Sequence, residues 1–187
     1  MDRIKKDGLG SLSQSAFKEW YAIVEAIGSG RQNILLRKGG IHEGKRGFEL
    51  RSESFWLFPT FFHQQLEKLN PEIGIDVIPQ FGQNIPIQYY CHSVSCDWID
   101  TEESLQKIEP SHFWTRKCVE EKFGWGSKNG VYGLRLAVFK LPDPIWIRMQ
   151  SNYKGCKSWI KIEDDNIEKI TKNHLSEVSY VGTGIDF

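Results

Sequence analysis

The stretch AIVEAIGSGRQNILLR, residues 22–37, decides how the start of the chain is interpreted. Two apolar runs, residues 22–26 and 33–37, lie on either side of the sequence IGSGRQ, which contains two glycines. Short apolar runs around such a turn are typical of a β-hairpin. The pattern therefore predicts two paired strands, with residues 17–21 forming either a helical turn or an extension of the first strand.

A strand followed by a helix is predicted after this hairpin. The run SFWLFPTFF is aromatic and short, and we expect its strand to end near Phe58 because Pro59 cannot continue a sheet ladder. Apolar residues then recur at Phe62, Leu66 and Leu69, at spacings of four and three, which indicates one face of a helix.

Two further helices are predicted in the middle of the chain, followed by more strands. In DTEESLQKIEP, Asp100 and Glu103 have the spacing of a capping box, and Pro110 closes the helix. The segment SHFWTRKCVEEKFGW predicts the next helix. The segments VYGLRLAVFKLPDPIWIRM and YKGCKSWIKI are rich in strand-forming residues.

The strands therefore occur both in hairpins and singly, with about three helices among them. This order predicts an α+β fold with a mixed, hairpin-containing sheet rather than a doubly wound parallel sheet. A chain of 187 residues suits one domain. We expect a disordered lead-in over residues 1–15, a single globular domain over residues 16–162, and a C-terminal appendage over residues 163–187 with one weak helix.

Charge and composition exclude several classes of protein. The 24 basic and 24 acidic residues cancel, so the chain lacks the overall basic charge of many nucleic-acid-binding proteins. We expect no membrane helix, since no apolar run reaches about 18 residues. The N-terminal sequence MDRIKKDGLGSLSQS has no apolar core typical of a secretory signal. The four cysteines form no C-x-x-C pair, which favours reduced thiols in a cytoplasmic protein and no metal site.

The glycine-rich loop in LLRKGGIHEGKRGFE, residues 35–49, matches no standard catalytic motif. It has glycines enough to surround an anion, but no helix is predicted after it, so the helix dipole of a phosphate loop is missing. His42 and Glu43 resemble a fragment of the metalloprotease motif H-E-x-x-H without its second histidine. The basic second half of the loop is more typical of a solvated hairpin than of a nucleic-acid patch.

Polar residues at the ends of the predicted elements are the candidates for a functional site. Element ends often converge in one cleft, where histidines supply acid–base groups. The candidate catalytic residues are His42, Glu43, His63 and His112, and the candidate ligand-binding residues are Arg37, Lys38, Gln64, Trp114, Thr115 and Lys157. Each has a structural alternative: a solvated loop histidine, a helix-capping histidine, or a core tryptophan. The residues indicate no particular cofactor.

Four blocks of sequence resemble a known prokaryotic family. In order, they are AFKEWYAIVEAIGSGRQNILLRKGGIHE, FWLFPTFFHQ, IEPSHFWT and YKGCKSWIKI, and together they span residues 16–162. They closely resemble the family catalogued as domain of unknown function 1802. The resemblance implies a soluble protein without an established activity. Some family members are fused to, or encoded beside, restriction-endonuclease-like domains, which implies a link to restriction–modification.

A weaker resemblance, in the order of elements, is to Nudix-like domains, which include a DNA-reading domain of adenine glycosylases. The catalytic Nudix helix requires a cluster of glutamates with an arginine. Here Glu67 and Glu72 are present, but the arginine–glutamate cluster is not. A Nudix-like fold would therefore imply binding rather than pyrophosphate hydrolysis.

Three functions follow as hypotheses. The first is a module associated with nucleic acid or nucleotides, acting in restriction–modification or defence, with DNA, a nucleotide, or a nuclease or modification subunit as partner. The second is a hydrolase with a histidine-lined cleft that cleaves phosphodiester or pyrophosphate bonds. The third is a protein-interaction subunit without chemistry, suggested by the neutral charge and 13% aromatic content.

Overall fold

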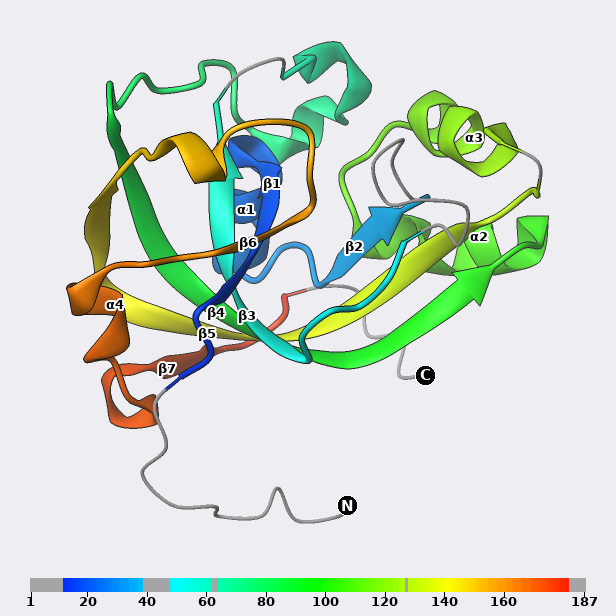
Figure 1. The fold of residues 1–187 in the computed structure, drawn as a ribbon. Coiled ribbons are helices and arrows are strands. Elements are labelled where there is room, and N and C mark those ends of the chain that lie inside the picture. The colour runs from blue at the N-terminus through cyan, green and yellow to red at the C-terminus, as the bar shows by residue number, and fades with distance from the viewer. Residues whose placement is uncertain (1–11, 39–47, 62–63, 127, 182–187) are drawn as a thin grey trace.

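The computed structural model describes residues 12–38, 48–61, 64–126 and 128–181 (Figure 1). These residues form one mixed sheet of seven strands with four α-helices around it, which confirms the predicted α+β class. The strands are β1 (Ser15–Trp20), β2 (Ile34–Arg37), β3 (Ser54–Thr60), β4 (Asn84–Ile99), β5 (Val131–Arg148), β6 (Trp159–Lys161) and β7 (Ser176–Val178). The helices are α1 (Tyr21–Gly28), α2 (Glu102–Ile108), α3 (Arg116–Gly124) and α4 (Asp165–Glu168).

One parallel strand pair sets the geometry of the sheet. The order is β2-β5-β4-β3-β1-β6, with β7 also paired to β5. β1 and β3 are parallel, and their register places Trp20 opposite Thr60. The other described pairs are antiparallel. Because β1 and β3 run in the same direction, both strands terminate at the same end of the sheet.

The long hairpin of β4 and β5 is the backbone of the sheet. The two strands pair from Asn84↔Arg148 to Ile99↔Val131, with two register shifts along the way. β2 pairs with the first part of β5, and β7 pairs with a later part. The excursion between β4 and β5 carries α2 and α3, which lie together at one end of the molecule (Figure 1).

Two of these helices begin at threonine caps. The Thr101 side chain accepts a hydrogen bond from the backbone N–H of Ser104, so the cap of α2 is Thr101 and not Asp100 as the sequence suggested. Thr115 caps α3 in the same way by accepting from the N–H of Cys118. Each cap satisfies one of the N–H groups that a helix leaves unpaired in its first turn.

The predicted N-terminal hairpin is wrong, because its first apolar run forms helix α1. Ala22, Ile23, Ala26 and Ile27 are all buried, and their spacing fits one face of a helix as well as a short buried strand. Gly30, with φ +73°, turns the chain after α1 toward β2. The fold therefore starts as strand, helix, strand.

Two other segments also differ from the sequence prediction. Where the helix with Leu66 and Leu69 was expected, the described residues form two short 3-10 turns, Leu66–Lys68 and Pro71–Ile73. Pro71 begins the second turn instead of ending a helix. The C-terminal segment, expected as an appendage, contributes β7 to the sheet.

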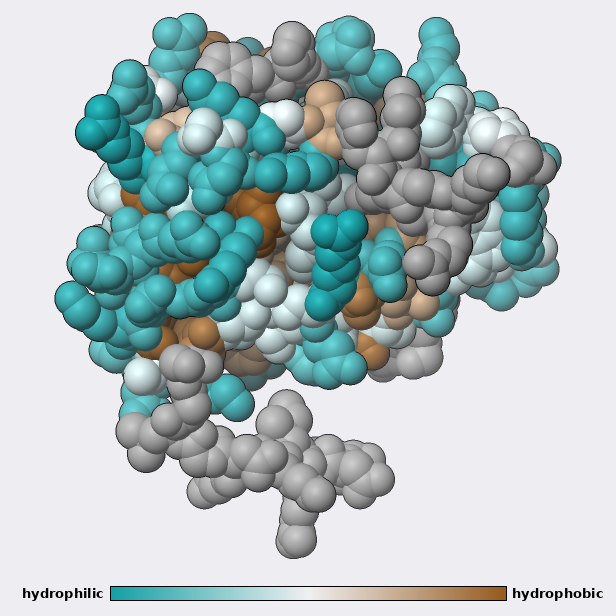
Figure 2. Space-filling view, in the orientation of Figure 1, coloured by the Kyte–Doolittle hydropathy of each residue, from teal (hydrophilic) through white to brown (hydrophobic). Residues whose placement is uncertain are grey.

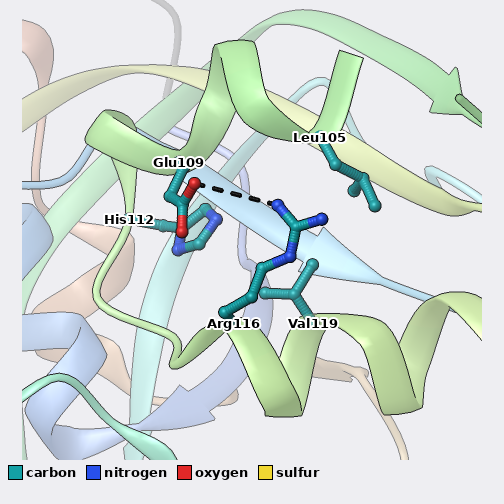
Figure 3. A pocket seen from close by; sticks show the side chains of 5 residues that line it. All are labelled: Leu105, Glu109, His112, Arg116 and Val119. Carbon is teal, nitrogen blue, oxygen red and sulfur yellow. Dashed lines mark ion pairs between the residues drawn. The ribbon is translucent and has the colours of Figure 1, made fainter. Parts of the chain in front are cut away.

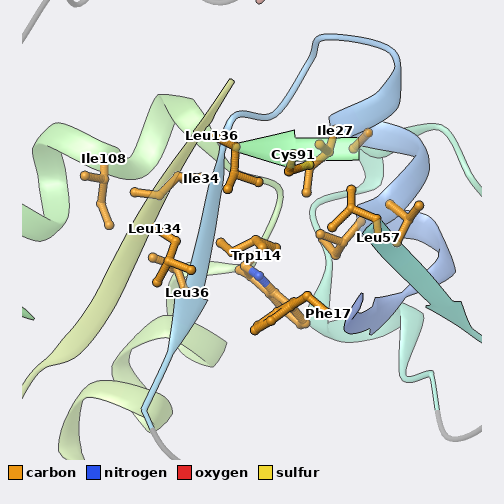
Figure 4. Close-up of a cluster of buried hydrophobic side chains, with 14 of the residues drawn as sticks. Phe17, Ile27, Ile34, Leu36, Leu57, Cys91, Ile108, Trp114, Leu134 and Leu136 are labelled. Carbon is orange, nitrogen blue, oxygen red and sulfur yellow. The ribbon is translucent and has the colours of Figure 1, made fainter. Parts of the chain in front are cut away.

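The sheet separates two hydrophobic clusters. Along β3, Phe55 and Leu57 belong to one cluster, whereas Trp56 and Phe58 belong to the other. Successive side chains of a strand point to opposite faces, so the clusters lie on opposite sides of the sheet. Figure 4 shows part of the larger cluster, where Trp114 and Phe17 lie among aliphatic side chains from β2, β3 and β5. Each face of the sheet is therefore covered by one hydrophobic cluster.

The outer surface is mostly hydrophilic in the view of Figure 2, with apolar side chains visible between the polar ones. Among the described residues, no helix has the length and apolar character that crossing a bilayer requires.

Candidate functional site

A group of charged and aromatic side chains gathers where β1, β2 and β3 end and α3 packs against them. We name it the strand-end cluster; its members are Glu19, Trp20, Arg37, Lys68, Trp114 and Lys122. Glu19 and Trp114 are buried at 3% and 5% exposure, and the other four are half-buried. The buried members therefore form the floor of the cluster, and the half-buried members form its rim.

An ion pair between Arg37 and Glu19 lies at the base of the cluster. Arg37 Nη1 is 2.8 Å from Glu19 Oε2, and the two side chains are 16% and 3% exposed. The other Glu19 oxygen, Oε1, accepts a hydrogen bond from the backbone N–H of Trp20 at 2.7 Å. A carboxylate this deeply buried requires a partner charge, because desolvation strongly disfavours an isolated one.

Arg37 also connects two strands that do not pair with each other, β2 and β1. Its Nη2 donates to the carbonyl of Lys18 at 2.9 Å, and its Nη1 donates to the carbonyl of Leu36. The guanidinium lies over the Phe17 ring, 4.5 Å from its centroid. The position of Arg37 is thus fixed by a carboxylate, two carbonyls and an aromatic face.

Two tryptophans and a lysine form the aromatic part of the cluster. The rings of Trp20 and Trp114 have centroids 4.9 Å apart. The Lys122 ammonium lies over the Trp114 ring, 3.4 Å from its centroid, which is a cation–π contact. The backbone around Trp114 is held by the bridge to Leu69 and by the hydrogen bond from Thr115 N–H to the Lys68 carbonyl.

The cluster carries more positive than negative charge. Burial, together with the nearby charges of Arg37 and Lys68, lowers the pKa of Lys122 to about 8, whereas Glu19 acts in the opposite direction. Three cations against one carboxylate leave an excess of positive charge at a partly desolvated place. An anion bound there would relieve this repulsion.

His112 is buried beside the cluster and is neutral near pH 7. Burial, followed by the charge of Lys122, lowers its pKa to about 4. Its Nδ1 accepts a hydrogen bond from the backbone N–H of Trp114 at 3.2 Å. Figure 3 shows His112 among the side chains that line a pocket, where Arg116 pairs with Glu109 at 3.8 Å. The hydrogen bond indicates that His112 orients the loop carrying Trp114.

Gln64 and Thr60 connect β3 to the start of α1. Gln64 donates to the Thr60 carbonyl, and its Oε1 accepts from the N–H of Ala22 at 3.4 Å. Thr60 Oγ1 donates to the Glu19 carbonyl at 3.0 Å. These bonds keep the ends of β1 and β3 together beneath the cluster.

The remaining predicted residues lie elsewhere or have structural partners. Lys38 donates to the carbonyls of Phe123, Lys128 and Gly130, which ties β2 to the end of α3. Thr115 caps α3, and Lys157 is exposed just before β6. Burial lowers the pKa of Lys18, and the nearby charge of Lys157 lowers it as well.

Three of the four predicted catalytic residues, His42, Glu43 and His63, lie outside the described residues. The structure therefore places Arg37 and Trp114 in one cluster, with Gln64 and His112 beside it. Within the described part of the chain, no group of three or more His, Cys, Asp or Glu side chains is arranged to hold a metal ion.

Four members of the cluster were not predicted from the sequence: Glu19, Trp20, Lys68 and Lys122. For Glu19 a signal was present, because it shares a strand face with the core residue Phe17, and a charged residue on a buried face needs an explanation. Lys122 gave no comparable signal. Its place on Trp114 arises from the packing of α3 against the sheet.

Comparison with known proteins agrees with this architecture. A family model described as "Domain of unknown function (DUF1802)" matches residues 16–181. Among solved structures, an ASCH protein from Zymomonas mobilis matches with a TM-score of 0.52 and 12% identity, covering 84% of this chain and 95% of that chain. A mutant of the Zymomonas mobilis ASCH protein matches with a TM-score of 0.52 and 11% identity, over 83% and 92% of the two chains. The search among curated proteins found no match.

At such low identity the likeness to ASCH proteins concerns the fold alone. The family match is of a different kind, because it extends from β1 to the residues that follow β7 and includes every element described above. Its range contains the four sequence blocks, which span residues 16–162. The chain therefore belongs to the DUF1802 family.

Proposed function

We propose that this protein binds a nucleic acid or nucleotide at the strand-end cluster. The observation that carries the proposal is the arrangement of Lys122, Lys68 and Arg37 around Glu19 and beside a tryptophan pair. Nucleotides combine an anionic phosphate with a flat aromatic base. The cluster offers a matching surface, with cations for the phosphate and the half-buried Trp20 ring for the base.

The cations of the cluster differ in how free they are to bind. Arg37 already has a carboxylate and two carbonyls as partners, so it acts mainly by positioning Glu19 and adding positive potential. Lys122 is half-buried and contacts the Trp114 ring. The carboxylate that acts on this ammonium, Glu19, is already paired with Arg37. A phosphate oxygen would therefore give Lys122 a negative partner of its own. We therefore assign Lys122 as the main phosphate-binding residue.

Binding is a better proposal than hydrolysis for the described residues. Of the predicted catalytic histidines, His112 is the one described, and its Nδ1 is used by the Trp114 N–H. A catalytic base must reach the proton it removes, whereas His112 is buried and oriented toward the backbone. A role beside a nuclease or modification subunit, in restriction–modification or defence, stays a prediction.

The test is a binding titration with labelled single-stranded and duplex DNA and RNA at several salt concentrations. Phosphate contacts are strongest at low salt, and losing one such contact lowers the slope of log affinity against log salt by about 1. We expect Lys122→Met to weaken binding and to reduce the slope in this way. Lys117→Met is the matched control, since Lys117 is an exposed lysine on the same helix.

Two outcomes would contradict the proposal. One is that the wild-type protein binds no oligonucleotide at low salt. The other is that Lys122→Met and Lys117→Met bind equally well, which would separate any binding from the cluster.

A further inference from the structure

Four aromatic side chains from four segments of the chain form a row on the surface. We name it the aromatic row: Tyr21 at the start of α1, Phe61 after β3, Phe81 before β4, and Trp146 near the end of β5. The ring centroids are 5.3 Å apart for Tyr21–Phe61, 5.3 Å for Phe61–Phe81 and 5.1 Å for Phe81–Trp146. The rings therefore form a continuous series of contacts.

The row remains partly open to solvent. Trp146 is 50% exposed, and the other three members are half-buried. Large aromatic side chains bury most of their surface when they serve the core alone. The exposed Trp146 ring therefore leaves apolar area available to a ligand.

The row and the strand-end cluster are neighbours along the chain. Trp20 lies opposite Thr60 in the parallel pair of β1 and β3, and the residues that follow these two strands, Tyr21 and Phe61, belong to the row. Trp20 packs against the larger hydrophobic cluster, whereas Phe61 packs against the other one. The row and the cluster therefore both lie at the end of the sheet where β1 and β3 terminate.

Positive charge is present at the far end of the row as well. Arg148 lies two residues after Trp146 on β5, on the same face of the strand, and is exposed. It donates to Gln83 Oε1 at 3.3 Å, and Gln83 lies two residues beyond Phe81. Near Tyr21 the carboxyl of Glu25 accepts from the Tyr89 hydroxyl, and the nearby Lys140 offsets its charge. The row thus has a cation, Arg148, at the Trp146 end, and a balanced pair of charges near Tyr21.

We propose that the aromatic row extends the strand-end cluster into a track for single-stranded nucleic acid several nucleotides long. The inference rests on the proposed function and specifies its ligand. Bases would stack on the exposed ring faces of the row, while Arg148 at one end and Lys122 at the other attract the phosphates. A duplex keeps its bases stacked inside and cannot offer them to the rings, so the single strand is the matching form.

The experiment compares oligonucleotides of two lengths, about 3 and about 12 nucleotides, below and within the usual range of site sizes for single-strand-binding folds. Labelled oligothymidylate and oligouridylate are titrated at low salt, together with a duplex of the longer length. We expect Trp146→Ala to weaken binding of the longer strand about tenfold, the loss typical of one stacked base, and to leave the shorter strand unaffected. Trp125→Ala is the matched control, because Trp125 is 52% exposed and lies outside the row.

The titrations distinguish failure of the row proposal from failure of the cluster proposal. If Trp146→Ala behaves like Trp125→Ala while Lys122→Met weakens both lengths, the row proposal is overturned and the cluster proposal stands. If the wild-type protein binds no single strand of either length, both fall. If Trp146→Ala instead changes the oligomeric state in sedimentation, the row is a self-association surface and the track is overturned.

Discussion

The ion pair between Arg37 and Glu19 allows a quantitative test of how the site is held together. At the observed separation of 2.8 Å, and with the effective dielectric constant of about 20 that suits protein sites, the attraction is about 6 kcal/mol. Most of this offsets the desolvation of the two charges. The pair therefore contributes little net stability, but either charge alone is costly.

The two single substitutions should differ in cost. Arg37→Met leaves the Glu19 carboxylate, at 3% exposure, without its ion-pair partner, and we expect a loss of about 3–5 kcal/mol in the free energy of unfolding. Glu19→Gln should cost less, about 2 kcal/mol, because Arg37 keeps its two carbonyl acceptors and the Phe17 ring. The double variant removes both charges and should be more stable than Arg37→Met.

Urea unfolding followed by tryptophan fluorescence measures all four proteins of this double-mutant cycle. We expect a coupling free energy of at least about 2 kcal/mol, since the second substitution removes the charge that the first leaves unpaired. Costs that add to within about 0.5 kcal/mol would refute the reasoning. If Arg37→Met does not fold, Arg37→Lys, which keeps the charge but loses the planar contacts, should give an intermediate cost.

Three further predictions follow from the structure. Because Lys122 has a pKa of about 8, oligonucleotide affinity should fall as the pH rises from 7 to 9, and Lys122→Met should abolish this dependence in the same titration. The pKa of His112 is lowered to about 4, so the unfolded chain binds more protons than the folded protein between pH 6.5 and 4. The free energy of unfolding should therefore fall by up to about 3 kcal/mol as the pH drops through this window. His112→Gln should flatten that part of the stability curve, measured by urea unfolding. A β-carbon on Gly28 would lie 2.1–2.5 Å from the Tyr89 ring, so Gly28→Ala should lower the thermal midpoint clearly, whereas alanine at the open Gly124 should not.

Local patterns in the sequence were enough for part of the fold. The Thr115-containing segment was predicted as a helix and forms α3, and the two strand-rich stretches after it form β5 and β6. The prediction over residues 22–26 failed because a short apolar run has no periodicity that separates a buried strand from a buried helix. The C-terminal strand β7 was missed because three residues paired to β5 carry almost no local signal.

The candidate site, too, was predicted only in part from the sequence. Arg37 and Trp114 were singled out because they lie near the ends of predicted elements, and both belong to the cluster. Lys38 was selected for the same reason, yet its ammonium is used by three carbonyls near the end of α3. Arg37 and Lys38 are neighbours in the sequence, so position along the chain does not distinguish them. Their partners depend on which distant segments pack beside each side chain.

The sequence by itself determined the family, the α+β class and the residue types available for binding. These depend on composition, on the order of the four sequence blocks and on short-range periodicity, all of which can be read along the chain without knowing which distant residues meet. The tertiary structure alone decided that Glu19 faces Arg37, that Lys122 lies on Trp114, and that Tyr21, Phe61, Phe81 and Trp146 form one row. Each of these contacts joins distant segments of the chain, and its geometry follows from the parallel pairing of β1 with β3 and the docking of α3.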